Sequence, residues 1–161
     1  MPTDLYLAYT APINPTGATP ILTKPQVWAG LQRKIRFAQE FVSAIATCDV
    51  ISDSGEREVV REVVFAADTS KRVKETVVSY RPLKVDFHQA DGSLVSNIVS
   101  DGPSGAAEDI FMTYTFQWLG QPAEPGSEEE GRLLEKFKGG AKMAVEGSIE
   151  TIRKIAREGK V

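Results

Sequence analysis

The chain has 161 residues, of which 42% are hydrophobic and 25% charged, and its formal net charge is −3. These values are ordinary for a single soluble domain, residues 1–161, that buries a hydrophobic core. The small negative charge and the lack of a Lys/Arg cluster argue against a nucleic-acid partner and against electrostatic attachment to an acidic membrane. No apolar run reaches the length of a membrane span.

The N-terminus and the cysteine content favour a cytoplasmic protein. Asp4 lies in a segment with no basic region, so no signal peptide is predicted. Cys48 is the single cysteine, which excludes an intrachain disulfide. His88 is the single histidine, and no carboxylate cluster accompanies it, so no metal is expected. No nucleotide-binding or nucleophile-elbow motif is present, so no cofactor is expected either.

The N-terminal third predicts a strand and then a helix. Residues 4–13 alternate Leu5 and Leu7 with more polar side chains, which is typical of a strand. Thr23 and Gln26 form a capping box that begins a helix. The apolar stripe of this helix is expected to consist of Val27, Trp28, Leu31 and Ile35. Its other face is expected to be basic, with Arg33, Lys34 and Arg36.

The middle of the chain predicts antiparallel strands. Residues 48–56 read as one strand, and residues 59–78 read as a valine-rich hairpin. Residues 83–89 and 93–101 form a second hairpin, joined by a type I turn with a glycine bulge. Residues 109–119 form the last strand, with one face made of Ile110, Met112, Tyr114, Phe116 and Trp118.

The first hairpin places two charged residues on its apolar face. A turn centred on Thr69 pairs Phe65 with Val73, Val63 with Glu75 and Arg61 with Val77. The face expected to be buried then holds Val59, Arg61, Val63, Phe65, Val73, Glu75 and Val77. Because unpaired buried charges are very costly, Arg61 and Glu75 are expected to be partnered if both are inside. They form a structural ion pair, orient a polar group of a ligand, or transfer a proton.

Two further polar residues are candidates for the same interior. Asn97 faces Val85 if the glycine-bulge turn holds, whereas a two-residue turn would place Ile98 inside instead. Tyr114 lies among apolar residues on the last strand, and its hydroxyl needs a partner if it points inward.

The C-terminal part predicts one long helix. Ser127 and Glu130 form a second capping box, and the helix extends to about Glu158. At ~1.5 Å per residue it spans roughly 45 Å, enough to cross a whole sheet. Gly139 and Gly140 interrupt it and are expected to mark close packing or a bend near a pocket mouth.

The order of elements predicts an α+β fold, in which a curved antiparallel sheet of about seven strands wraps around the long C-terminal helix. A sheet bent in this way is expected to leave a cavity between itself and the helix.

The sequence also resembles the START/SRPBCC helix-grip superfamily of the birch-pollen allergen, and more narrowly an AtaL-like group of small proteins. The resemblance rests on residues 22–42, 59–65, the Lys74-Glu75 pair, 96–100 and 110–118, and with the strand order it covers essentially the whole chain. It implies a helix-grip domain with an internal ligand cavity. Its members include lipid carriers, hormone receptors and polyketide cyclases, so the resemblance specifies the fold more closely than the chemistry.

The expected function is to bind a hydrophobic small molecule; if the protein is an enzyme, the expected chemistry is cofactor-free cyclisation, dehydration or isomerisation of a natural-product intermediate. A non-catalytic carrier would use the same pocket, and a protein-interaction module is a weaker third hypothesis. The protein is expected to be a monomer or a homodimer. Arg61, Glu75 and Tyr114 are the catalytic candidates. The ligand-binding candidates are Arg61, Val63, Phe65, Glu75, Val77, Asn97, Met112, Tyr114, Phe137 and Ala141.

Overall fold

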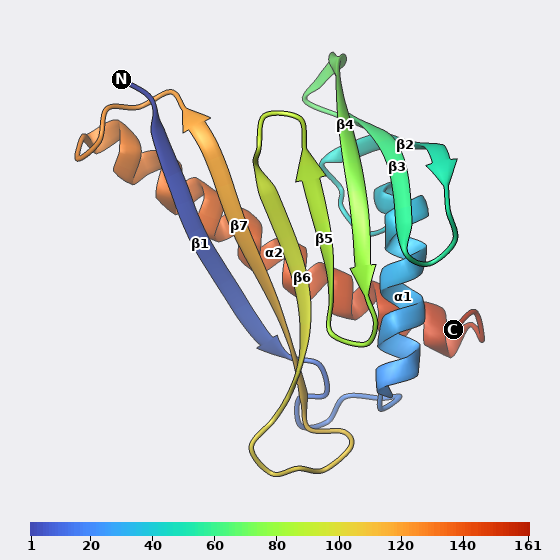
Figure 1. Cartoon of the computed structure of the whole chain (residues 1–161). Coiled ribbons are helices and arrows are strands. Elements are labelled where there is room, and N and C mark those ends of the chain that lie inside the picture. Colours follow the sequence, from blue (N-terminus) through green and yellow to red (C-terminus); the bar gives the residue numbers. More distant parts are fainter.

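The computed structural model describes all residues, 1–161, as one antiparallel sheet with two helices on one of its faces (Figure 1). The strands are β1 Thr3–Pro12, β2 Ile45–Asp53, β3 Glu58–Phe65, β4 Asp68–Tyr80, β5 Lys84–Gln89, β6 Leu94–Asp101 and β7 Ile110–Gln121. The helices are α1 Lys24–Arg36, the short 3-10 helix η1 Ala38–Glu40, and α2 Glu128–Arg157.

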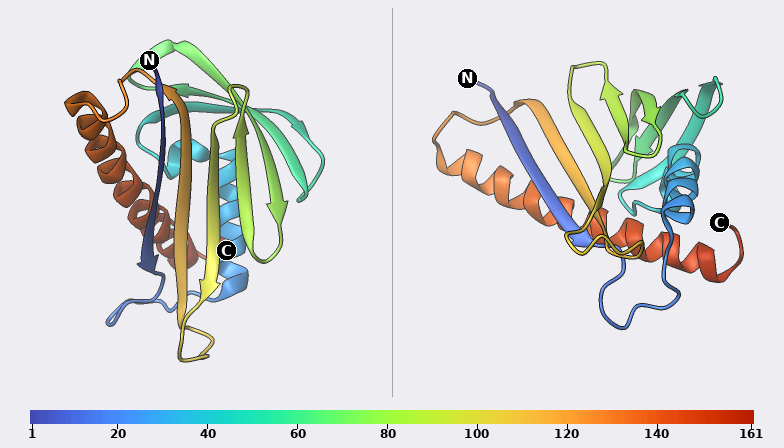
Figure 2. Two further views of the ribbon diagram at one scale, coloured as in Figure 1. Left: turned by 60° about the vertical axis from the view of Figure 1, so that its left-hand side comes forward. Right: turned by 60° about the horizontal axis from the view of Figure 1, so that its bottom comes forward.

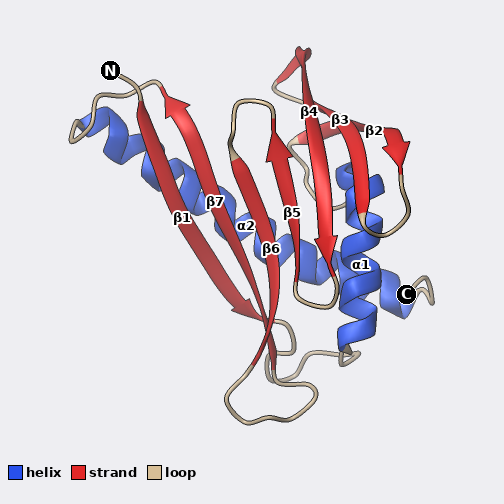
Figure 3. Cartoon of the chain, in the orientation of Figure 1, coloured by secondary structure: helices blue, strands red, loops and turns tan.

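The sheet has the order β1-β7-β6-β5-β4-β3-β2, so β1 and β2 form its two edges. It curves strongly, and α2 runs across its concave side while α1 covers the half formed by β2, β3 and β4 (Figures 2 and 3). α2 packs against β1 and β7, and α1 packs against α2. The predicted α+β helix-grip fold of seven antiparallel strands around a long C-terminal helix is therefore confirmed. No helix is both long and apolar enough to cross a membrane.

The β3–β4 hairpin forms as expected, but the predicted pairing is wrong by two residues. Arg61 pairs with Glu75 and Val63 pairs with Val73, because the turn lies at residues 66–67 and not at Thr69. A bulge after Val64 absorbs the extra residues at the start of β4. Since side chains alternate with a period of two, a shift of two residues leaves Arg61, Val63, Val73 and Glu75, which lie before the bulge, on their predicted face. Arg61 and Glu75 are thus both inside, and directly opposite each other.

The β5–β6 hairpin confirms the glycine-bulge turn. Gly92 has φ +91°, and its N–H donates to the Gln89 carbonyl at 3.1 Å. This turn pairs Val85 with Asn97 and buries Asn97 completely, while Ile98 lies on the other, partly exposed face. The inward position of Asn97 follows from the turn geometry.

Both long helices begin at the predicted residues. Thr23 and Gln26 form both halves of the capping box of α1. Ser127 caps α2 by accepting from the Glu130 N–H, but the Glu130 carboxylate does not return to Ser127. It accepts from Thr3 Oγ1 at 2.9 Å instead, and so ties the first turn of α2 to β1.

Glycines have opposite roles in the two helices. The expected close packing at Gly139 and Gly140 is wrong, because a Cβ on either residue would meet nothing within 4 Å. The close approach is at Gly30 of α1, where a Cβ would lie 2.6 Å from Cγ1 of the fully buried Ile152 of α2. The absence of a side chain at Gly30 allows α1 to approach α2 closely.

We expect alanine to have opposite effects at these positions. Gly139→Ala should stabilise the protein by up to about 1 kcal/mol through helix propensity alone. Gly30→Ala should instead destabilise it by about 1–3 kcal/mol, because Ile152 must move within a packed core. Denaturant titration of the two variants measures both effects. An equal gain in stability from both variants would mean that α1 and α2 are not in close contact at Gly30.

Candidate functional site

A buried lysine lies at the centre of the concave side, on a helix face where it was not expected. The sequence placed Lys34 with Arg33 and Arg36 on a basic face, but only 6% of Lys34 is exposed, so this assignment is wrong. Lys34 follows Leu31 by three residues and Val27 by seven, and this helical spacing places all three on one face. The signal was present in the sequence, and the positive charge concealed it.

The Lys34 side chain spans the core to reach the sheet. Its amine donates to Asn97 Oδ1 at 2.8 Å on β6 and to Tyr114 Oη at 3.0 Å on β7. The nitrogen lies 4.3 Å from the centre of the Tyr114 ring and 5.3 Å from that of Phe87. The predicted candidates Asn97 and Tyr114 are direct neighbours in the sheet, and Lys34 binds them both.

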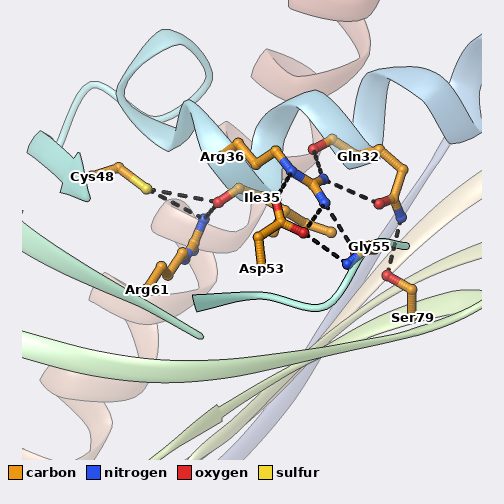
Figure 4. Close-up of polar contacts among 8 residues, drawn as sticks. All are labelled: Gln32, Ile35, Arg36, Cys48, Asp53, Gly55, Arg61 and Ser79. Atoms are coloured by element: carbon orange, nitrogen blue, oxygen red, sulfur yellow. Dashed lines mark hydrogen bonds and ion pairs between the residues drawn. The ribbon is translucent and has the colours of Figure 1, made fainter. Parts of the chain in front are cut away.

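Arg61 binds the backbone of α1 at the turn that carries Lys34. Its Nη1 donates to the carbonyl oxygens of Lys34, at 3.1 Å, and Ile35, at 2.8 Å (Figure 4 shows the bond to Ile35). These carbonyls lie in the last turn of α1, where helix carbonyls lack partners within the helix and carry partial negative charge. The guanidinium of Arg61 therefore caps the C-terminus of α1 from within the core.

Glu75 joins Arg61, Lys34, Asn97 and Tyr114 in one buried polar cluster. Its Oε1 accepts from Arg61 Nε at 2.9 Å and from Nη2 at 2.7 Å, and its Oε2 accepts from Gln89 Nε2 at 3.2 Å. The pair is buried, with 5% and 8% of its side chains exposed, and it is fully partnered. The structural hypothesis for Arg61 and Glu75 thus fits the geometry, because the pair connects β3 and β4 to α1.

The surroundings of Lys34 bring its protonated and neutral forms close to balance near pH 7. Burial lowers the pKa of Lys34 to about 7; the positive charge of Arg61 adds to the fall, and Glu75 opposes it. With the amine neutral, the charges of Arg61 and Glu75 balance and no net charge is buried. Lysines whose pKa is lowered by burial act as bases and nucleophiles in enzymes.

Two buried polar atoms beside the amine have no hydrogen-bond partner. One is Asn97 Nδ2, on the amide whose oxygen accepts from Lys34; the other is Ser148 Oγ, on α2. Burial raises the pKa of the Tyr114 phenol, and Ser148 opposes this rise without the geometry of a full hydrogen bond. The phenol is therefore neutral at physiological pH. Four elements, α1, β6, β7 and α2, meet at this point.

The remaining candidates surround the cluster without making polar contacts to it. Val77, Met112 and Ala141 belong to the hydrophobic core, and Val63 is buried at the far end of β3. Phe65 and Phe137 are partly exposed. Sequence reasoning missed Lys34, Gln89 and Ser148. The inward faces were identified from their apolar residues alone, so these three polar residues on the same faces were overlooked.

One end of the concave side is apolar and partly open. Trp118 of β7 stacks on Phe116 at 6.0 Å and on Phe137 of α2 at 5.8 Å between ring centres. Trp118, Phe137 and the nearby Val95 of β6 are only partly buried, whereas Tyr114 and Asn97 further along β7 and β6 are fully buried. Aromatic side chains with free faces can contact an apolar ligand.

A pocket of about 480 Å³ opens between α2 and the segment that follows α1. Phe41 and Ala144 line it, and both pack into the core, so its floor is continuous with the interior. Gly140 and Gly147 of α2 also line the pocket. No three His, Cys, Asp or Glu side chains are grouped so that they could hold a metal ion.

A curved antiparallel sheet gripping a long C-terminal helix is the helix-grip fold. A family model described as acetylaranotin biosynthesis cluster protein L (AtaL) matches residues 7–159. The match covers most of the chain, and the protein belongs to this family. No curated protein sequence matches the chain significantly.

Solved structures share the fold at low sequence identity. The di-domain ARO/CYC StfQ from the steffimycin biosynthetic pathway is 9% identical with a TM-score of 0.68, covering 96% of this chain and 51% of its own. The KanY protein is 15% identical with a TM-score of 0.62, covering 96% of this chain and 99% of its own. Ara h 8.0201 is 11% identical with a TM-score of 0.57, covering 92% and 98%. The chain therefore spans about half of the di-domain protein and nearly all of the other two.

The Arg61–Glu75 pair generates a prediction about stability. Arg61→Met should be the more harmful single change, costing about 3–5 kcal/mol, because it strands both the Glu75 carboxylate and two carbonyls of α1. Glu75→Leu should cost less, since Arg61 keeps the helix carbonyls. The double variant should be more stable than Arg61→Met alone, as measured by denaturant titration. Small, additive losses of a few tenths of a kcal/mol would contradict a buried pair.

The lowered pKa of Lys34 predicts how stability depends on pH. Between about pH 7 and the ordinary lysine value of 10.5, the unfolded chain holds a proton that the folded chain lacks. Unfolding therefore takes up a proton, and the stability of the folded protein should rise with pH across this window, by about 2 kcal/mol between pH 7.5 and 9. Lys34→Met should abolish this rise in denaturant titrations. The same rise in both proteins would show that the Lys34 pKa is not lowered by folding.

Proposed function

We propose that the protein binds a hydrophobic small molecule of natural-product biosynthesis on the concave side of its sheet. The observation that carries the proposal is that Lys34, Asn97 and Tyr114 form a buried polar cluster on the same face of the sheet as the partly exposed Trp118, which is further along β7. Ligand sites in proteins are mostly apolar, with a few polar groups that fix orientation. Trp118 and Phe137 supply the apolar surface, and Lys34, Asn97 and Tyr114 supply the polar end.

The comparisons support the same proposal. The family is described by a natural-product gene cluster, and the StfQ structure is described as an ARO/CYC protein of a biosynthetic pathway. A site of this kind is suited to cofactor-free cyclisation, dehydration or isomerisation. Holding a flexible molecule in a reactive shape contributes several kcal/mol by orientation. Lys34 and Tyr114 can move protons, and Asn97 can donate to an oxygen on which charge develops.

The ligand reaches the site from the partly open end of the concave side. Val95, Trp118 and Phe137 are partly exposed there, and the pocket beside Phe41 and Ala144 opens on the same side as α2. Arg61, Glu75 and Gln89 form a polar row that contacts the Phe87 ring through Arg61, at 4.9 Å. In this proposal the row positions α1, while Lys34 contacts the ligand.

Binding of an apolar fluorescent dye tests the proposal. Phe137→Asp places a charge on the apolar surface and should weaken dye binding at least tenfold. Tyr6→Asp makes a matched aromatic-to-acid change on the outer face of β1, where 64% of Tyr6 is exposed, and should leave binding unchanged. Unaltered binding in Phe137→Asp, or equal losses in both variants, would contradict a site on the concave side.

A second experiment tests whether the protein is an enzyme or a carrier. Native mass spectrometry of the protein purified from its own organism detects a retained small molecule, which is then incubated with fresh protein. Chemical change of the ligand that is lost in Lys34→Met identifies an enzyme. Release of the unchanged ligand identifies a carrier and contradicts the catalytic part of the proposal.

A further inference from the structure

Asn97 and Tyr114 hold the Lys34 amine between an amide oxygen and a phenol. A neutral amine has two N–H groups and one lone pair. The bond to Asn97 Oδ1 uses one N–H group, and the Tyr114 hydroxyl, 3.0 Å away, meets either the second N–H group or, as the stronger donor, the lone pair. The charged groups near this nitrogen are Arg61 of β3 and Glu75 of β4, which bind each other. The amine is therefore held beside a hydroxyl that can exchange a proton with it, and its electron pair can form a bond to carbon once that hydroxyl donates to another acceptor.

The unpartnered donor beside this amine indicates what the site is built to meet. Asn97 is completely buried, and its Nδ2 has no acceptor. The amide orientation is fixed, because its oxygen accepts from Lys34. A buried donor without an acceptor costs about 1–3 kcal/mol, so such groups are rare unless a water or a ligand satisfies them. An oxygen atom that accepted from Asn97 Nδ2 would lie close to the Lys34 nitrogen, because the same amide binds Lys34 through its oxygen.

A carbonyl group satisfies both requirements at once. We propose that Lys34 binds an aldehyde or ketone ligand covalently as an imine, with Asn97 Nδ2 donating a hydrogen bond to the carbonyl oxygen. This inference rests on the proposed function and specifies the ligand class of the same site. A carboxylate or a hydroxyl group would also supply an acceptor oxygen. Neither of them has a carbon atom to which the amine adds readily, whereas an aldehyde or ketone does.

The reaction balances without a cofactor. The lone pair of Lys34 Nζ forms a C–N bond, and the carbonyl π electrons move to the oxygen beside Asn97. A proton passes from the nitrogen to this oxygen through the Tyr114 hydroxyl, which gives a carbinolamine. Loss of the second nitrogen proton and of the hydroxyl as water leaves a C=N bond. The net change is one amine and one carbonyl converted to one imine and one water.

An imine explains how a site without a cofactor would perform the proposed chemistry. A protonated imine withdraws electrons from the neighbouring carbon, so a C–H bond next to it loses its proton more readily than in the parent carbonyl compound. Cyclisation, dehydration and isomerisation of carbonyl compounds all begin with loss of such a proton. The lowered pKa of Lys34 supports this role, because a protonated amine has no lone pair for the first step.

Reductive trapping tests the proposal. The full chain is incubated at pH 7 with hexanal and sodium cyanoborohydride, and each lysine is quantified for alkylation by peptide mass spectrometry. Lys34 should be labelled at least tenfold more than Lys142, an exposed lysine whose pKa is raised by its bonds to Glu146 and Tyr9. Labelling of Lys34 at or below the level of Lys142 would overturn the proposal.

Two variants test the role of Asn97 and the source of the signal. Asn97→Leu has the same branched shape but lacks both the Nδ2 donor and the Oδ1 acceptor of Lys34, and it should lower labelling of Lys34 at least fivefold without changing that of Lys142. Equal labelling of Lys34 in Asn97→Leu would overturn the assigned role of the amide. Lys34→Arg should remove the dominant labelled peptide, and persistence of that peptide would assign the reaction to another lysine.

The dye measurement distinguishes the absence of imine formation at Lys34 from failure of the proposed ligand-binding function. If the dye binds as expected while Lys34 remains unlabelled, the protein binds an apolar ligand but forms no imine. If the dye also fails to bind on the concave side, both proposals are contradicted. Circular dichroism at the labelling temperature confirms that each variant is folded before its labelling is compared.

Discussion

The contact on which the rest of the interior depends is the capping of α1 by Arg61. A guanidinium has five donors in a fixed plane, and Arg61 uses them to bind Glu75 on one side and two carbonyls of α1 on the other. A buried charge is tolerated only when it is fully partnered, so these contacts must form together. They determine where α1 ends and which of its side chains face the sheet. Figure 4 shows that Arg36 and Gln32 reinforce this position through Asp53 and Ser79.

The position of Lys34 follows from that contact together with the close approach of the two helices. Arg61 binds the carbonyl of Lys34, while the side chain of the same residue reaches Asn97 and Tyr114. Lys34 therefore connects the Arg61–Glu75 ion pair, which its backbone contacts, to the polar groups of β6 and β7, which its side chain contacts. Gly30, one helical turn earlier, lets α1 pack closely against Ile152 of α2. Of the three ionisable residues Lys34, Arg61 and Glu75, Lys34 is the one without a countercharge of its own, and it is the one whose pKa falls to about 7.

The sequence was sufficient to predict the fold and the faces of its strands, because both follow from local patterns. Turn chemistry placed Asn97 inside, and β-strand alternation placed Arg61 and Glu75 inside even though the predicted pairing was two residues off. Lys34 was missed because its charge was taken as a sign of exposure, although its spacing places it on the buried face. Whether a lysine is buried depends on partners from distant strands, and these become visible only in the folded chain.

If the interior binds a ligand as proposed, the balance of charge in this cluster also restricts which ligands it accepts. With Lys34 neutral, Arg61 and Glu75 compensate each other, and a neutral ligand leaves that balance intact. An anionic ligand would bring an unpaired negative charge into the core, and the protein could compensate it only by protonating Lys34. The protonated amine has no lone pair, so an anion that binds there silences the nucleophile. A neutral carbonyl ligand keeps the amine reactive, and the apolar surface formed by Trp118 and Phe137 favours the same neutral ligands.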